Sequence, residues 1–243
     1  MYRHLDPHRI GETLVALSQR IDERFPGSGL GRVNRELIEI SQRTAHNVEL
    51  LRRPLWPIRI AAVVGAVAMI ALFGMALYLA LRTAPGTSLT DTQVGLSEYF
   101  QGIEALVNDV VFLGIAVWFV MTLETRVKRR RALAAIHELR SISHIVDMHQ
   151  LTKDPERLLT SRRDTASSPA RNMTREELSR YLDYCSEMLS VTSKLAALYA
   201  QNFADPVVLE TVSEVETLTT GLSGKIWQKI QLLQEAREAS AVS

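Results

Sequence analysis

The stretch IRIAAVVGAVAMIALFGMALYLAL, residues 58–81, decides how this chain of 243 residues is interpreted. Apart from Arg59 at its edge it carries no charge. A helix of this length reaches about 36 Å, enough to cross a hydrocarbon core about 30 Å thick. The stretch therefore predicts a membrane span. Its small residues Ala61, Gly65 and Ala68 would allow another helix to approach closely, so they are candidate helix-packing positions.

A second apolar stretch, IEALVNDVVFLGIAVWFVMTL at residues 103–123, predicts a second span. Glu104, Asn108 and Asp109 interrupt its first turns, and only residues 110–123 are uniformly apolar. That shorter segment cannot cross a bilayer alone. The span has to include the polar turns, or else tilt or thin the bilayer.

The candidate intramembrane polar residues are Glu104, Asn108, Asp109 and Tyr78. In an antiparallel hairpin, Asp109 lies about two turns deep, near the level of Tyr78. A carboxylate at that depth usually has a function, such as lining an ion pathway. Alternatively, Glu104, Asn108 and Asp109 lie in the outer interface above a shorter span.

Basic residues predict the orientation of the spans. The first span is flanked by Arg52, Arg53 and Arg59, and RVKRRR at residues 126–131 follows the second. The connection, residues 82–102, has Arg82 at its edge as its only basic residue. Because lysine and arginine gather on the cytoplasmic side, both termini are predicted to be cytoplasmic, and the connection is an outside turn. In a bacterium the membrane would be the inner, plasma membrane.

The basic run after the second span is assigned to lipid headgroups and topology, because a polybasic segment just inside a span serves both. Nucleic acid is not expected as a partner. The residues assigned in this way are Arg126, Lys128, Arg129, Arg130 and Arg131.

Helix-start signals and apolar spacing predict helices on both sides of the spans, and no alternating strand pattern appears. Asp205 precedes Pro206, so a capping carboxylate stands before a proline at the first helical position. Thr174 with Glu177 forms a capping box. An Asp-Pro pair also precedes the first helix of the chain.

The sequence thus predicts an all-α protein of three parts. Residues 1–53 form a cytoplasmic N-terminal helical hairpin, and residues 54–125 form a two-span transmembrane helical hairpin. Residues 126–243 form a C-terminal cytoplasmic antiparallel helical bundle that continues the second span. Two long amphipathic helices in this bundle have a coiled-coil-like seam, and residues 160–173 are a mobile loop.

The run HELRSISHIVDMHQ, residues 137–150, raises the question of a metal or proton site. At 100° per residue, Arg140, His144, Asp147 and Met148 lie on or beside the face opposite an apolar stripe. We interpret these four as an interaction network whose polar members are satisfied by a neighbouring helix or a second copy. A metal site at His144 and Asp147 is the weaker alternative, because two ligands do not complete such a site.

Composition and motifs argue against catalysis. The net charge is +1, and the chain has no GxSxG, Walker lysine or nucleotide fingerprint. The single Cys185 lies on the apolar seam of its helix, where a thiol packs as a small hydrophobe. No cofactor is expected, and the N-terminus does not resemble a signal peptide.

These patterns predict an oligomeric, membrane-anchored helical module for interaction or assembly, and not an enzyme. Its expected partners are the lipid bilayer, further copies of the chain and a cytoplasmic protein. One alternative is a small oligomeric ion channel or ion-coupled transporter with Asp109 in the pathway. A further alternative is a metal-dependent membrane enzyme that uses His144 and Asp147.

Overall fold

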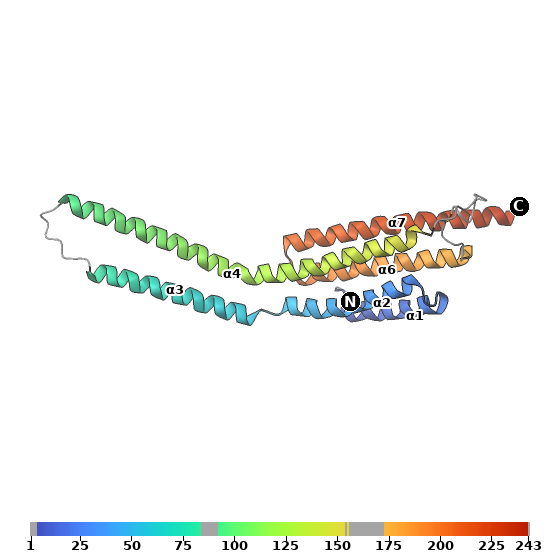
Figure 1. Ribbon diagram of the computed structural model, residues 1–243, viewed down its shortest axis with the longest axis horizontal. Helices are drawn as coiled ribbons and strands as arrows, with labels where there is room; N and C mark the ends of the chain where they lie inside the picture. The colour runs from blue at the N-terminus through green and yellow to red at the C-terminus, as the bar shows by residue number, and fades with distance from the viewer. Residues whose placement is uncertain (1–3, 84–91, 154, 156–172, 243) are drawn as a thin grey trace. The chain divides into compact units, whose positions relative to one another are not determined.

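The computed structural model describes residues 4–83, 92–153, 155 and 173–242, and within them every regular element is a helix (Figure 1). The all-α class is therefore confirmed. Of the predicted mobile loop, residues 160–172 lie outside the described residues. The helices are α1 (Pro7–Arg24), α2 (Gly29–Arg52), α3 (Trp56–Thr83), α4 (Thr92–Leu151), α6 (Arg175–Asn202) and α7 (Pro206–Val242).

The chain divides into two compact units. Residues 54–128, called the apolar unit here, contain α3 and the first part of α4. Residues 1–53 and 129–243 form the bundle unit, which contains the other helices and the second part of α4. The sequence analysis treated the N-terminal hairpin as a separate part, whereas in the structure it shares one core with the C-terminal helices.

The predicted helix-start signals are present where the spacing placed them. Asp6 caps α1 by accepting a hydrogen bond from the His8 backbone N–H, with a proline in the first turn. At the start of α6, Thr174 and Glu177 form the reciprocal capping box. Each cap satisfies backbone donors that have no partner inside their own helix.

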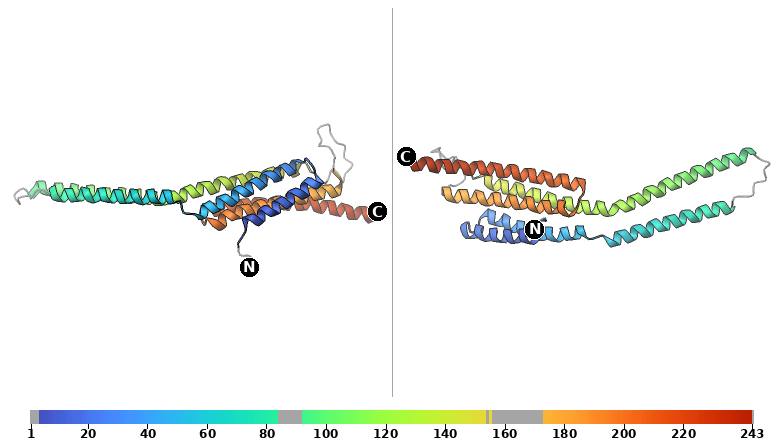
Figure 2. Two further views of the ribbon diagram at one scale, coloured as in Figure 1. Left: turned by 90° about the horizontal axis from the view of Figure 1, so that it is seen from below. Right: turned by 180° about the vertical axis from the view of Figure 1, so that it is seen from behind.

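The bundle unit consists of two helical hairpins and the second part of α4 (Figure 2). A short turn joins α1 to α2, and Gly27 in that turn has a φ of 70°, which a residue without Cβ adopts readily. Helix α6 is joined to α7 by residues 203–205. The predicted apolar seams of α6 and α7 are present and buried, and their buried residues are Leu178, Leu182, Cys185, Leu189, Thr192, Ala196, Tyr199, Val208, Val212, Val215, Leu222, Ile226, Ile230 and Leu233.

The second part of α4 contributes one face to this core. The predicted stripe is buried, with the side chains of Ile136, Leu139 and Val146 fully inaccessible to solvent. Lys229 of α7 donates hydrogen bonds to the Gln150 carbonyl at 3.0 Å and to the Gln150 side chain at 2.6 Å. Because the last carbonyls of a helix lack donors, this lysine stabilises the end of α4.

Helix α4 begins at Thr92, which corrects the predicted turn over residues 82–102. The next proline after that residue is Pro155, so nothing in the intervening sequence stops a helix. The two glycines at 95 and 102 each cost about 1 kcal/mol relative to alanine, which a long helix tolerates. The helix also continues through RVKRRR without interruption, as predicted.

The apolar unit exposes its large hydrophobic side chains. On α3, Val63 and Leu72 are 63% and 71% exposed, and on α4 Phe112 is 71% exposed. By length and composition, one described helical segment, Val107–Leu151, could cross a membrane, and none of its apolar window is buried. Helix α3 adds a shorter apolar segment, Arg59–Met75.

Candidate functional site

Glu124 links α3 to α4 inside the apolar unit, just beyond the predicted second span. One carboxylate oxygen accepts from Arg59 Nε at 2.6 Å. The other accepts from the Leu55 backbone N–H at 3.3 Å and pairs with Lys128 at 2.9 Å. Arg59, followed by Lys128 and the Leu55 N–H, lowers the pKa of Glu124 to about 2, so the carboxylate is charged at neutral pH.

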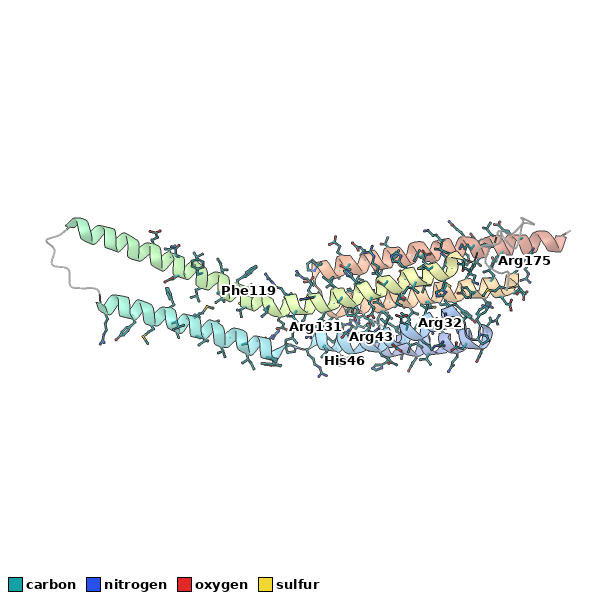
Figure 3. The ribbon with its side chains drawn as sticks, viewed as in Figure 1. Arg32, Arg43, His46, Phe119, Arg131 and Arg175 are labelled. Atoms are coloured by element: carbon teal, nitrogen blue, oxygen red, sulfur yellow. The ribbon has the colours of Figure 1, made fainter. Side chains whose placement is uncertain are left out.

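The basic run after the apolar segment has several partners within the protein. In the apolar unit, the Arg126 guanidinium lies 5.8 Å from the Trp118 ring centroid and 5.1 Å from that of Phe119. Figure 3 labels Phe119 on α4. The bundle unit resumes at Arg129, and the next two residues of the run, Arg130 and Arg131, are exposed. Lys128 and Arg129, by contrast, are ion-paired with the protein carboxylates Glu124 and Asp205.

Asp205 is a buried acid of the bundle unit, with a side chain only 4% exposed. One carboxylate oxygen accepts from the backbone N–H groups of Val207 and Val208 at 3.1 and 3.3 Å. The other accepts from Arg129 Nε at 2.9 Å and from a terminal guanidinium nitrogen at 2.7 Å. The predicted helix cap is thus also an ion pair that fixes the start of α7 to α4.

The predicted intramembrane polar residues are not gathered into one site within the described residues. Glu104, Asn108, Asp109 and Tyr78 are all exposed in the apolar unit. Arg82 lies over the Tyr78 ring, with its guanidinium 5.4 Å from the ring centroid.

The small-residue positions of α3 are uncovered within the described part of the chain. Ala61 and Ala68 are exposed and Gly65 is half-buried. A Cβ added at Gly65 would meet no described atom within 4 Å.

The four residues assigned to an interaction network have separate environments. Arg140 pairs with Glu214 of α7 at 3.0 Å, and both side chains are about half exposed. Asp147 accepts a hydrogen bond from the Gln150 side chain at 2.6 Å. His144 is exposed, and Met148 is 66% exposed. Arg140 thus contacts α7 directly, and Asp147 is connected to α7 through Gln150, which accepts from Lys229. His144 and Met148 stay on the surface.

Other residues of the same run, outside the predicted network, contact α2. Glu138 pairs with Arg43 at 2.7 Å, and Figure 3 labels Arg43 on α2. The His149 ring lies against Gly29 so closely that an added Cβ on the glycine would overlap it. Burial, followed by the positive charges of Arg32 and Lys153, lowers the pKa of His149. The run is therefore a three-way contact among α2, α4 and α7.

The weaker alternative was a metal site at His144 and Asp147, and the described residues provide no further ligands for it. Within the described residues, no three His, Cys, Asp or Glu side chains come together in a way that could hold an ion. Cys185 is fully buried, and burial raises the pKa of its thiol to about 12. A thiol that stays protonated at neutral pH is a poor nucleophile, in agreement with its predicted packing role.

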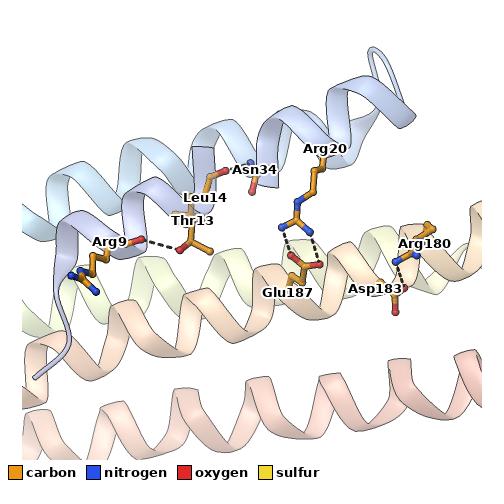
Figure 4. Close-up of polar contacts among 8 residues, drawn as sticks. All are labelled: Arg9, Thr13, Leu14, Arg20, Asn34, Arg180, Asp183 and Glu187. Carbon is orange, nitrogen blue, oxygen red and sulfur yellow. Dashed lines mark hydrogen bonds and ion pairs between the residues drawn. The ribbon is translucent and has the colours of Figure 1, made fainter. Parts of the chain in front are cut away.

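The sequence analysis did not find a groove that runs along α6 in the bundle unit. Two adjoining hollows, of about 550 and 540 Å³, share Arg180 and Asp183 of α6 as lining residues. The walls come from α1 on one side and α7 on the other. Figure 4 shows α6 between these helices, with Arg20 of α1 reaching Glu187 of α6. We call this surface the α6 groove.

Comparison with protein-family models, curated proteins and solved structures gives no match for this chain. Functional inference therefore rests on the contacts described above.

Proposed function

We propose that the protein is a membrane-anchored docking module, in which the apolar unit is a two-span hairpin and the bundle unit is a cytoplasmic interaction domain. The observation that supports this proposal most directly is the exposure of apolar side chains around α3 and the first part of α4. A helix that is hydrophobic on all sides needs an apolar environment, and the described chain does not supply one.

The charges next to these helices support an orientation with both termini in the cytoplasm. Glu124 is neutralised by Arg59 and Lys128, while Arg130 and Arg131 remain exposed to interact with anionic headgroups. The bundle unit, in turn, has a core of its own and ion pairs that connect its helices. Such a unit is suited to recognition rather than to chemistry. Self-association of the anchor through Ala61, Gly65 and Ala68 remains part of the proposal.

Topology mapping tests this function. Single cysteines replacing Ser88 and Ser243, in a Cys185→Ala background, are labelled in intact cells with a membrane-impermeant maleimide. We expect Ser88→Cys to react from outside and Ser243→Cys to react only after permeabilisation. Reaction of Ser243→Cys in intact cells, or recovery of the protein in the soluble fraction, would refute the anchor and its orientation.

A further inference from the structure

The α6 groove combines an apolar wall with a cationic end. Trp227 and Ile230 of α7 face Ile10 of α1 across the first hollow. Trp227 lines this hollow and is 56% exposed, so a large aromatic side chain is available to a bound partner. Burial, which outweighs the opposing charge of Arg180, raises the pKa of Asp183 on the α6 side of the groove.

The second hollow carries an excess of positive charge. Its lining includes the arginines Arg24, Arg175, Arg180 and Arg237, with the carboxylates Glu176 and Asp183. Arg180 and Asp183 pair at 3.6 Å, as Figure 4 shows. This hollow lies beside the start of α6, where the helix dipole adds a partial positive charge. Figure 3 labels Arg175 at this position.

The length of the groove matches a helix. Its lining on α6 runs from Arg175 to Lys194, which corresponds to roughly 28 Å along the axis. The same face carries the small side chains of Ser179, Ser186 and Ser190. An apolar stripe with acidic residues at one end would complement this surface in both shape and charge.

We propose that the α6 groove binds an amphipathic helix of a partner protein, with its apolar stripe on Trp227 and its acidic end at Arg24, Arg175 and Arg180. The inference rests on the proposed function, because it identifies the surface through which a docking module would act. It also specifies the partner chemistry: about five helical turns, an apolar face and a cluster of carboxylates at one end.

Trp227 provides the test. The full-length protein, purified in detergent with Trp56→Phe and Trp118→Phe, leaves Trp227 as its one fluorophore of this type. The probes are synthetic helical peptides of about 18 residues with a leucine stripe and a terminal block of glutamates. One control peptide carries lysines in place of the glutamates, and a second keeps the composition but scrambles the stripe.

We expect the glutamate peptides to shift Trp227 emission to shorter wavelength, with affinity that falls as salt is added. Arg24→Glu and Arg180→Glu each weaken binding by about tenfold, and the double variant binds the lysine peptide instead. Arg32→Glu is the matched control, because Arg32 is an exposed arginine of α2 that does not line the groove. It leaves binding unchanged.

Three results would overturn the proposal. The first is no Trp227 response to any glutamate peptide up to about 1 mM, or an equal response to the scrambled peptide. The second is self-association that disappears in Trp227→Ala, which assigns the groove to another copy of the chain. The third is a Trp227 response only to anionic vesicles, which assigns it to lipid. Topology mapping is independent of these outcomes, so failure of the groove and failure of the anchor are distinguishable.

Discussion

The two parts of α4 obey opposite burial rules within one continuous helix. In the apolar unit, Ile115 is 57% exposed and Phe112 is 71% exposed. In the bundle unit, Ile136 and Leu139 are completely buried. Both parts are helical, but residues 110–123 of the first are apolar on all sides, whereas the second is apolar only on one stripe. Hydrophobicity alone therefore does not indicate burial, because the pattern around the helix decides which environment it requires.

The same substitution in each part of α4 should give the largest difference. Ile136→Ala removes a fully buried side chain, so we expect the bundle unit to lose about 2–5 kcal/mol of stability. Ile115→Ala removes atoms that face outward, and the loss should stay below about 1 kcal/mol. Chemical unfolding in detergent, followed by Trp227 fluorescence in the Trp56→Phe and Trp118→Phe background, measures both. Equal losses would break the distinction between the two parts.

Asp205 tests how strongly α7 is fixed to the bundle part of α4. Asp205→Ala removes the helix cap and leaves Arg129 without its carboxylate, so we expect a loss of about 2–4 kcal/mol. Asp205→Asn keeps an acceptor for the α7 backbone and should lose about half as much. The same unfolding measurement applies. If the two variants are equally destabilised, the helix cap makes no contribution to stability beyond that of the ion pair.

Gly29 and His149 test how tightly the end of α4 packs against the start of α2. Gly29→Ala should reduce stability by about 1–2 kcal/mol, because the added methyl group displaces the His149 ring. In a His149→Ala background the same glycine substitution should cost nothing, or should stabilise the start of α2, since alanine favours helix. A double-mutant cycle gives the coupling. Additive effects would show that the ring moves aside freely.

The smallest expected effect is a pH dependence at the same contact. The pKa of His149 is lowered in the folded protein, so the unfolded chain takes up a proton first as the pH falls. The stability that His149 contributes should be fully present at a pH above the ordinary histidine pKa of 6.5, and it should decrease as the pH falls below that value. His149→Gln should flatten the profile of unfolding midpoint against pH between about 7 and 5. An unchanged profile would exclude His149 as the titrating group.

Local patterns were sufficient to predict much of this fold. The seams of α6 and α7 and the stripe of α4 around Leu139 follow from helical periodicity, and the caps at Thr174 and Asp205 follow from residue type. The start of α4 at Thr92 was missed, because glycines weaken a helix but do not end it.

The contacts of the candidate site depend on how the helices pack, which the spacing of residues along one helix does not determine. Arg140 was expected to find its partner on a neighbouring helix or a second copy, and spacing could not identify that partner as Glu214, which is 74 residues away in sequence. The α6 groove depends on which face of α6 is left uncovered by α1 and α7, and that depends on how three helices pack. A sequence signal was nevertheless present in the serines and charged residues of α6 that lie beside its apolar seam.

The pair between Arg129 and Asp205 has a consequence for the order of events during synthesis. The two residues are 76 positions apart, so Arg129 is made well before its acid partner. While the proposed spans insert, Arg129 would still carry an uncompensated charge and would count toward cytoplasmic retention of the basic run. Lys128 differs, since Glu124 is only four residues earlier. Arg129 would thus have two roles: first as a topology signal in the nascent chain, and later as the ion-pair partner that holds α7 to α4 in the folded protein.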